Sequence, residues 1–119
     1  MQKTILYVED HPPARFLMSA IVSDLTPFRL VTVGSGGEAR AAAANEHPDL
    51  YLLDLDLPDT DGAALAEMLN GIHPAPVIIV SAYAESIRSE RFPAVVTDYL
   101  AKPLDPDHVA ETLKRALGG

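Results

Sequence analysis

Four ionisable side chains that can bind a metal and a phosphate each follow a short apolar run. Glu9 and Asp10 come after Ile-Leu-Tyr-Val, and Asp54 comes after Leu-Tyr-Leu-Leu. Lys102 comes after Tyr-Leu-Ala and precedes a proline. Apolar runs that alternate with helical patterns are typical of parallel sheets, in which the carboxyl ends of the strands form a ligand crevice. Clustered carboxylates repel one another unless a cation joins them, so the pattern predicts a hard divalent metal, a balancing lysine and phosphate chemistry.

The elements that must position these groups alternate between strands and helices. Strand patterns occur over residues 4–8, 29–33, 49–53, 76–80 and 95–100. The most apolar of these runs are typical of strands that are buried on both faces. Because crossovers between parallel strands are right-handed, we expect an α/β fold with a five-stranded parallel doubly wound sheet. The expected type is flavodoxin-like, with strand order 2-1-3-4-5 and helices on both faces.

The first and last helices are predicted from prolines and apolar spacing. The first starts near Pro12, and the last follows Pro106. The core side of the first helix is expected to contain Ala14, Leu17, Met18, Ile21 and Leu25. The core side of the last helix is expected to contain Val109, Leu113, Ala116 and Leu117.

Cap residues predict where two further helices begin. Ser35 with Glu38 three positions later is typical of a capping box, and Asp61 is a suitable N-cap for a short helix that closes at Gly71. A fourth helix can be placed only over residues 85–91, because Pro93 should end it. We therefore expect that helix to be short or irregular.

Length and composition fit one soluble domain of 119 residues with a single core. The chain is 48% hydrophobic and 22% charged, as folded proteins usually are. A net charge of -8 disfavours direct binding to nucleic acid or to an anionic membrane. The chain has no cysteine, no signal-peptide pattern and no apolar run of transmembrane length, so we expect a cytoplasmic protein without disulfides.

Four motifs occur in order along the chain. They are Glu9-Asp10, the segment DLYLLDLDLPDTDG over residues 49–62, Ser81-Ala82, and the segment DYLAKP over residues 98–103. With these motifs the chain resembles, over its whole length, a response-regulator receiver domain of two-component phosphorelays. A chemotaxis receiver has the same doubly wound strand order.

The resemblance implies that Asp54 accepts a phosphoryl group from a phosphohistidine donor. It also implies Mg²⁺ held by Glu9, Asp10, Asp54 and the backbone carbonyl of Asp56. Oxygen ligands with few protein carboxylates suit this ion. Lys102 would contact a phosphoryl oxygen as a point charge, and its peptide bond to the following proline is cis in relatives.

Ser81 and Tyr99 occupy the switch positions of the family. The resemblance implies that phosphorylation draws in Ser81, lets Tyr99 rotate inward and changes a surface built by the fourth helix, fifth strand and last helix. This chain departs from the family at Pro93 and at residues 95–97, where Val-Val-Thr stands near the usual Gly-Ala. We therefore expect an altered output surface.

The resemblance also implies partners. They are a histidine kinase or phosphotransfer protein, and a downstream effector protein or fused output domain, with a homodimer through the output surface. The expected module is not an enzyme beyond self-phosphorylation from small donors and autodephosphorylation. We expect a single receiver domain over residues 1–119, either alone or as the N-terminal part of a longer regulator.

Two alternatives stay open. The Leu-Leu-Asp-Leu-Asp run ending at Asp56 is similar to the nucleophile motif of haloacid dehalogenase-like Mg²⁺-dependent phosphohydrolases. Those enzymes carry Thr or Val at the position of Pro58, place the acid pair after the nucleophile and need a longer chain. The second alternative is a degenerate receiver that serves only as a protein-binding module, for which Asp54 would be dispensable.

Overall fold

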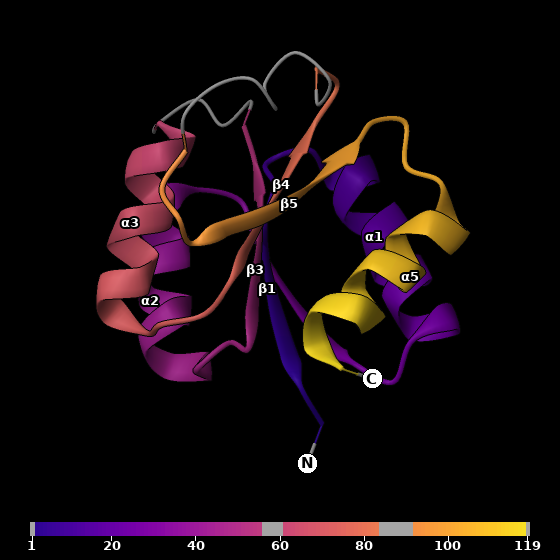
Figure 1. Ribbon diagram of the computed structural model, residues 1–119, viewed down its shortest axis with the longest axis horizontal. Coiled ribbons are helices and arrows are strands. Elements are labelled where there is room, and N and C mark those ends of the chain that lie inside the picture. The colour runs from indigo at the N-terminus through magenta and orange to yellow at the C-terminus, as the bar shows by residue number, and fades with distance from the viewer. Residues whose placement is uncertain (1, 56–60, 84–91, 119) are drawn as a thin grey trace.

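The computed structural model describes residues 2–55, 61–83 and 92–118, and within those ranges it has five strands and four helices (Figure 1). The strands are β1 (Thr4–Val8), β2 (Arg29–Val33), β3 (Leu50–Asp54), β4 (Val77–Ser81) and β5 (Val96–Ala101). The helices are α1 (Pro12–Leu25), α2 (Gly36–Glu46), α3 (Gly62–Ile72) and α5 (Pro106–Leu117). No helix in these ranges is long and apolar enough to cross a membrane.

Two predictions fall on residues outside the described ranges. These are the short fourth helix over residues 85–91 and the backbone carbonyl of Asp56 as a metal ligand. Pro58, which separates this chain from the phosphohydrolase motif, also lies outside them.

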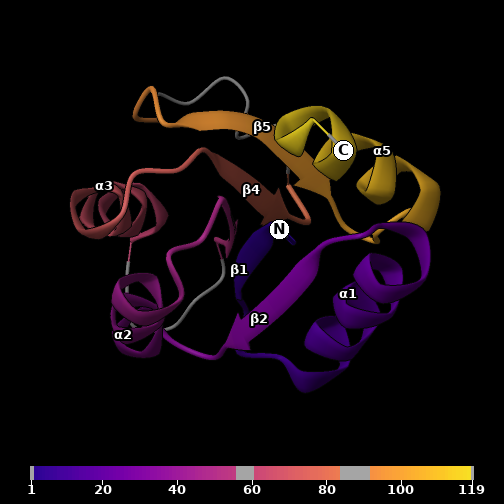
Figure 2. The same ribbon diagram turned by 90° about the horizontal axis from the view of Figure 1, so that it is seen from below.

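The strands form one parallel sheet in the order β2-β1-β3-β4-β5, which confirms the predicted fold class. Helices α1 and α5 cover one face, and α2 and α3 cover the other (Figure 2). Because every strand runs the same way, all five carboxyl ends lie at one edge of the sheet. The predicted site residues lie at that edge.

The three central strands β1, β3 and β4 are buried along their whole length. Alternate residues of these strands enter two separate cores, since side chains alternate between the faces of a sheet. On the α1–α5 side the strands contribute Ile5, Tyr7, Leu50, Leu52, Ile78 and Val80. On the α2–α3 side they contribute Leu6, Val8, Tyr51, Leu53, Val77 and Ile79. The sheet is thus a platform packed from both sides, which fixes whatever its strand ends carry.

Both predicted N-caps are present. The Ser35 hydroxyl accepts a hydrogen bond from the backbone N–H of Glu38 at 3.2 Å, and Oε1 of Glu38 accepts the N–H of Gly34 at 3.3 Å. The Asp61 carboxylate accepts the N–H of Ala63 at 2.9 Å. The bonds from the N–H groups of Glu38 and Ala63 satisfy donors that the first turn of a helix leaves unpaired, whereas Gly34 lies just before the N-cap of α2.

Two residues predicted on core faces lie at the surface instead. Leu17 is 42% exposed and Ala116 is also exposed, whereas Val22 and Thr112 are buried. The buried stripe of α1 runs through Met18 and the positions three and four residues after it, and Leu17 falls one position off this stripe. The apolar pattern alone did not fix how the helix is rotated against the sheet.

Ile78→Ala should lower the free energy of unfolding by roughly 2–5 kcal/mol, because Ile78 is fully buried in the α1–α5 core and the shorter side chain leaves a cavity. Ile72→Ala is the matched control, since Ile72 is 37% exposed at the end of α3 and should cost less than about 1 kcal/mol. Urea unfolding followed by circular dichroism measures both. Equal losses in the two variants would contradict the described core.

Candidate functional site

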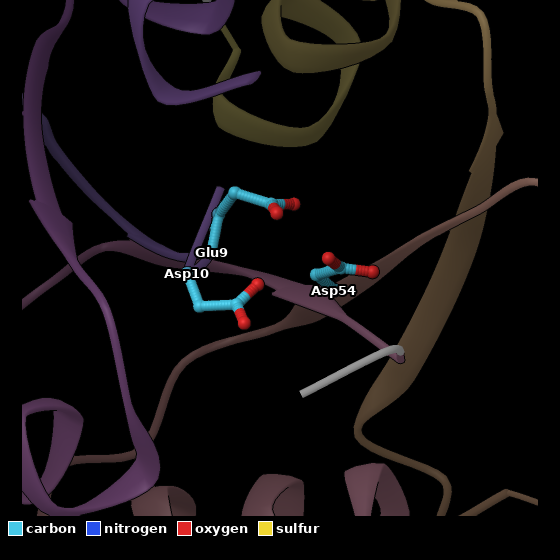
Figure 3. Close-up of side chains that lie close together, drawn as sticks. All are labelled: Glu9, Asp10 and Asp54. Carbon is cyan, nitrogen blue, oxygen red and sulfur yellow. The ribbon is translucent and has the colours of Figure 1, made fainter. Parts of the chain in front are cut away.

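The register of the sheet brings the predicted carboxylates together. Val8 of β1 pairs with Leu53 of β3, so Glu9 and Asp54 come next to each other at the strand ends. Figure 3 shows both carboxylates with that of Asp10 at this edge. One oxygen of each residue lies within 4.8 Å of the others. Glu9 and Asp54 are each only 1% exposed, whereas Asp10 is open to solvent.

Lys102 reaches this cluster from the loop after β5. Its Nζ lies 3.3 Å from Oε2 of Glu9 and 3.3 Å from Oδ2 of Asp54. The backbone N–H of Lys102 donates to the carbonyl of Ser81 at 3.0 Å, and the peptide bond to Pro103 is cis, as the resemblance implied. The ammonium therefore neutralises part of the charge of two buried acids, and the four predicted groups share one edge.

Burial has opposite effects on the pKa of Glu9 and on the pKa of Lys102. Burial, followed by the hydrogen bond and charge of Asp54, raises the pKa of Glu9 from 4.5 to about 7. Burial lowers the pKa of Lys102, but the charges of Asp54 and Glu9 outweigh it and the net shift is upward. Near neutral pH the cluster thus contains a carboxyl group that readily exchanges a proton, beside a firmly protonated amine.

Tyr7 is a site neighbour that the sequence did not reveal. Its hydroxyl donates to Oε2 of Glu9 at 3.2 Å, and the backbone N–H of His11 donates to Oε1 at 3.2 Å. Burial, and after it the charge of Glu9, raises the pKa of Tyr7 well above its ordinary value. The sequence signal that could have revealed this contact is the spacing of Tyr7 and Glu9, because residues two apart on a strand lie on the same face.

The predicted switch residues lie on neighbouring strands. Ser81 ends β4, is 1% exposed, and its hydroxyl accepts the backbone N–H of Tyr83 at 3.0 Å. Tyr99 of β5 is half-buried against the α2–α3 core, where its ring meets Phe92 edge-on with centroids 6.0 Å apart. Ser81 therefore adjoins the carboxylate edge through its bond to Lys102, while Tyr99 packs on the α2–α3 side of the sheet.

Comparison with known proteins agrees with this geometry. Residues 5–114 match the family model of the response regulator receiver domain. The chain is 33% identical over 116 residues to the transcriptional regulatory protein KdpE of Mycobacterium tuberculosis, covering 95% of this chain and 50% of that protein. It is 35% identical over 115 residues to the regulatory protein AtoC of Escherichia coli, covering 95% of this chain and 25% of that protein. The chain belongs to the response regulator receiver domain family, and it spans half or less of the length of these two relatives.

Solved structures show the same fold. The receiver domain of a sensor histidine kinase from Pseudomonas aeruginosa, which has a magnesium ion coordinated in its active site cleft, superposes with a TM-score of 0.85. It is 28% identical, and the match covers 100% of both chains. A sensor protein from Polaromonas gives a TM-score of 0.88 at 27% identity, covering 99% of this chain and 98% of that one. The protein is thus a receiver domain of two-component systems.

The acidic cluster of this chain suits a hard divalent cation. Its donors are carboxylate oxygens of Glu9, Asp10 and Asp54, with no sulfur and no imidazole among them. Mg²⁺ prefers oxygen donors and binds to proteins through few carboxylates. The exposed Asp10 leaves one side of the cluster open to solvent.

Without added metal, ionisation of Glu9 should destabilise the protein. A carboxyl whose folded pKa is about 7, against an ordinary 4.5, stabilises the fold fully below 4.5 and loses that contribution as pH rises through 7. Glu9→Gln cannot ionise, so the melting temperature of the wild type minus that of this variant should fall between about pH 5 and about pH 8. Thermal unfolding monitored by circular dichroism in the presence of a chelator measures it. A difference that does not change with pH would refute the assignment.

Proposed function

We propose that this receiver domain is a phosphoacceptor and that Asp54 takes the phosphoryl group from the phosphohistidine of a histidine kinase or phosphotransfer protein. The observation that carries the proposal is the position of Asp54. It ends a fully buried strand, lies beside the acid pair and contacts the Lys102 ammonium at 3.3 Å. A carboxylate so placed combines a nucleophile, oxygen ligands and a cation for the phosphoryl group at one edge.

In the transfer step an oxygen of Asp54 forms a bond to phosphorus. The bond from phosphorus to the imidazole nitrogen of the donor breaks, and its electron pair leaves with the imidazole. Glu9, Asp10 and Asp54 are the residues that would hold Mg²⁺, with the backbone carbonyl of Asp56 as a further proposed ligand. When bound, this ion supplies positive charge that reduces the repulsion between carboxylate and phosphoryl oxygens. Lys102 turns from the two acids to a phosphoryl oxygen and keeps it oriented.

The switch that follows involves Ser81 and Tyr99. The oxygen of the Ser81 hydroxyl accepts a hydrogen bond from the N–H of Tyr83. In the switch, the O–H of Ser81 donates a hydrogen bond to a phosphoryl oxygen. This draws the end of β4 toward the site, and the Tyr99 ring leaves its contact with Phe92. The change is a shift between two populations, and its size is set by how much better one conformation binds the phosphoryl oxygens.

The output surface includes β5 and α5. Asp98 of β5 and Arg115 of α5 form an ion pair there at 3.6 Å, and the Arg115 side chain is 61% exposed. A charged, partly exposed pair that joins β5 to α5 is suited to a polar protein partner. The proposed partners are an effector protein or a fused output domain, with a second receiver through the same surface, and the proposed location is the cytoplasm.

Family membership favours this proposal over the phosphohydrolase, and the set of residues at the site favours it over the degenerate receiver. A phosphohydrolase of the haloacid dehalogenase type places its acid pair after the nucleophile, whereas here Glu9 and Asp10 precede Asp54. A degenerate receiver has no need of the full set of phosphorylation residues. In this chain the described members of the set lie together at one edge.

Asp54→Asn should abolish phosphorylation, because an amide oxygen is a much poorer nucleophile than a carboxylate. The wild type incubated with acetyl phosphate and Mg²⁺ should gain the mass of one phosphoryl group, as measured by intact mass spectrometry. Asp24→Asn is the charge-matched control, since Asp24 is an exposed acid on α1, and it should be modified like the wild type. An unmodified wild type would sink the proposal.

Ser81→Ala should uncouple phosphorylation from the output surface. Asp54 should still be modified, but the shifts of β5 amide resonances on adding beryllofluoride should shrink by more than half, because the hydroxyl donor is gone. Two-dimensional NMR measures these shifts. Ser23→Ala, at an exposed position of α1, is the control and should respond fully. A full response in Ser81→Ala would show that the hydroxyl does not transmit the change.

A further inference from the structure

Tyr7 carries a buried hydroxyl that the proposed phosphoryl transfer does not use. The residue is fully buried in the α1–α5 core, and its only hydrogen bond shown among the described side chains is the one it donates to Oε2 of Glu9, at 3.2 Å. An apolar ring would fill the same core space without introducing a polar group. The presence of a hydroxyl at this buried position therefore has to be explained by its hydrogen bond to Glu9.

The partner is a flexible acid that needs to be held. Glu9 has one more methylene than an aspartate, so its carboxylate can occupy more positions around the strand end. Two neighbours in the chain each hold one of its oxygens. Tyr7, two residues before, holds Oε2, and the backbone N–H of His11, two residues after, holds Oε1. Both oxygens of the carboxylate are thus fixed from within β1 and the turn that follows it.

The hydrogen bond from Tyr7 to Glu9 persists in the proposed function, whereas the one from Lys102 is lost. Both groups reach Oε2 of Glu9, but Lys102 comes from a loop and is the group that turns to the phosphoryl oxygen in the proposed function. Tyr7 is locked in the middle of the sheet between its pairing partners Thr32 and Leu52. When the lysine moves, the tyrosine is the side-chain donor that stays on that oxygen.

From this geometry we propose that Tyr7 is a positioning residue, which orients the Glu9 carboxylate for Mg²⁺ through its hydroxyl. The inference rests on the proposed function, because it assigns Glu9 to the metal. Partners that hold a metal-binding group from behind typically change metal affinity by 10–100-fold when they are removed. Tyr7→Phe keeps the ring and its packing and removes only this donor.

The test is isothermal titration of Mg²⁺ into wild type, Tyr7→Phe and Tyr51→Phe. Tyr7→Phe should raise the Kd for Mg²⁺ roughly 10-fold. Tyr51 is the matched control, because it is equally buried and its hydroxyl donates to the carbonyls of Leu69 and His73 on the α3 side, not to the acids. Tyr51→Phe should leave the Kd within about twofold of the wild type, even though it also removes a buried hydroxyl.

A second background separates positioning from packing. In Glu9→Asp the carboxylate ends one methylene nearer the backbone, and we expect this to break its hydrogen bond with the Tyr7 hydroxyl. Adding Tyr7→Phe to this variant should then change the Kd by less than about twofold, which is the coupling expected of residues that act through each other. Circular dichroism checks that each variant is folded at the temperature of the titration.

Each outcome decides the inference. The inference is supported if Tyr7→Phe weakens Mg²⁺ binding in the wild-type background and does not weaken it further in the Glu9→Asp background. A wild type that binds Mg²⁺ while Tyr7→Phe binds equally well overturns the inference and leaves the proposed function standing. An equal loss in both backgrounds also overturns it, in favour of packing. A wild type that does not bind Mg²⁺ overturns both.

Discussion

The repulsion among carboxylates held at one sheet edge is the interaction on which the rest of this structure depends. Glu9 and Asp54 are almost fully buried and come from adjacent strands, so neither can move away from the other. Burial, together with the hydrogen bond and charge of Asp54, raises the pKa of Glu9. Ionised acids so close are unfavourable without a cation, which explains the position of Lys102 between the two acids. The same repulsion favours any cation or charge-neutralising group that enters. The fold thus builds an edge at which a cation would be stabilised.

Carboxylates can be held this close together only by a rigid part of the fold. The support comes from β1, β3 and β4, which are buried on both faces and paired in continuous register. Close packing on both sides resists displacement of a strand end. Of the two groups that move in the proposed switch, Lys102 lies in the loop after β5, and Ser81 is the last residue of β4. Lys102 can therefore turn without displacing the strands that hold Glu9 and Asp54.

Most of the fold and the acid cluster were predictable from sequence, because both follow from chain order and apolar periodicity. Strand bounds agree within a residue, and the carboxyl-end rule placed Glu9, Asp54 and Lys102 together. Leu17 was wrongly assigned to the core, since periodicity does not fix how a helix is rotated against the sheet. Tyr7 was missed for another reason. A tyrosine inside an apolar run is predicted to be a core residue, and only the three-dimensional structure shows which group its hydroxyl contacts.

The two-sided core has a consequence for how the domain can be tuned. Tyr7 belongs to the core beneath α1 and α5, whereas Tyr99 packs on the core beneath α2 and α3, so a single layer of strands lies between them. In the proposed function, substitutions beneath α1 and α5 would change metal binding and phosphorylation at the carboxylate edge, and substitutions around Tyr99 would change the output surface. Sensitivity and response would then rest on different sets of side chains. A lineage of such domains can change one while it preserves the other.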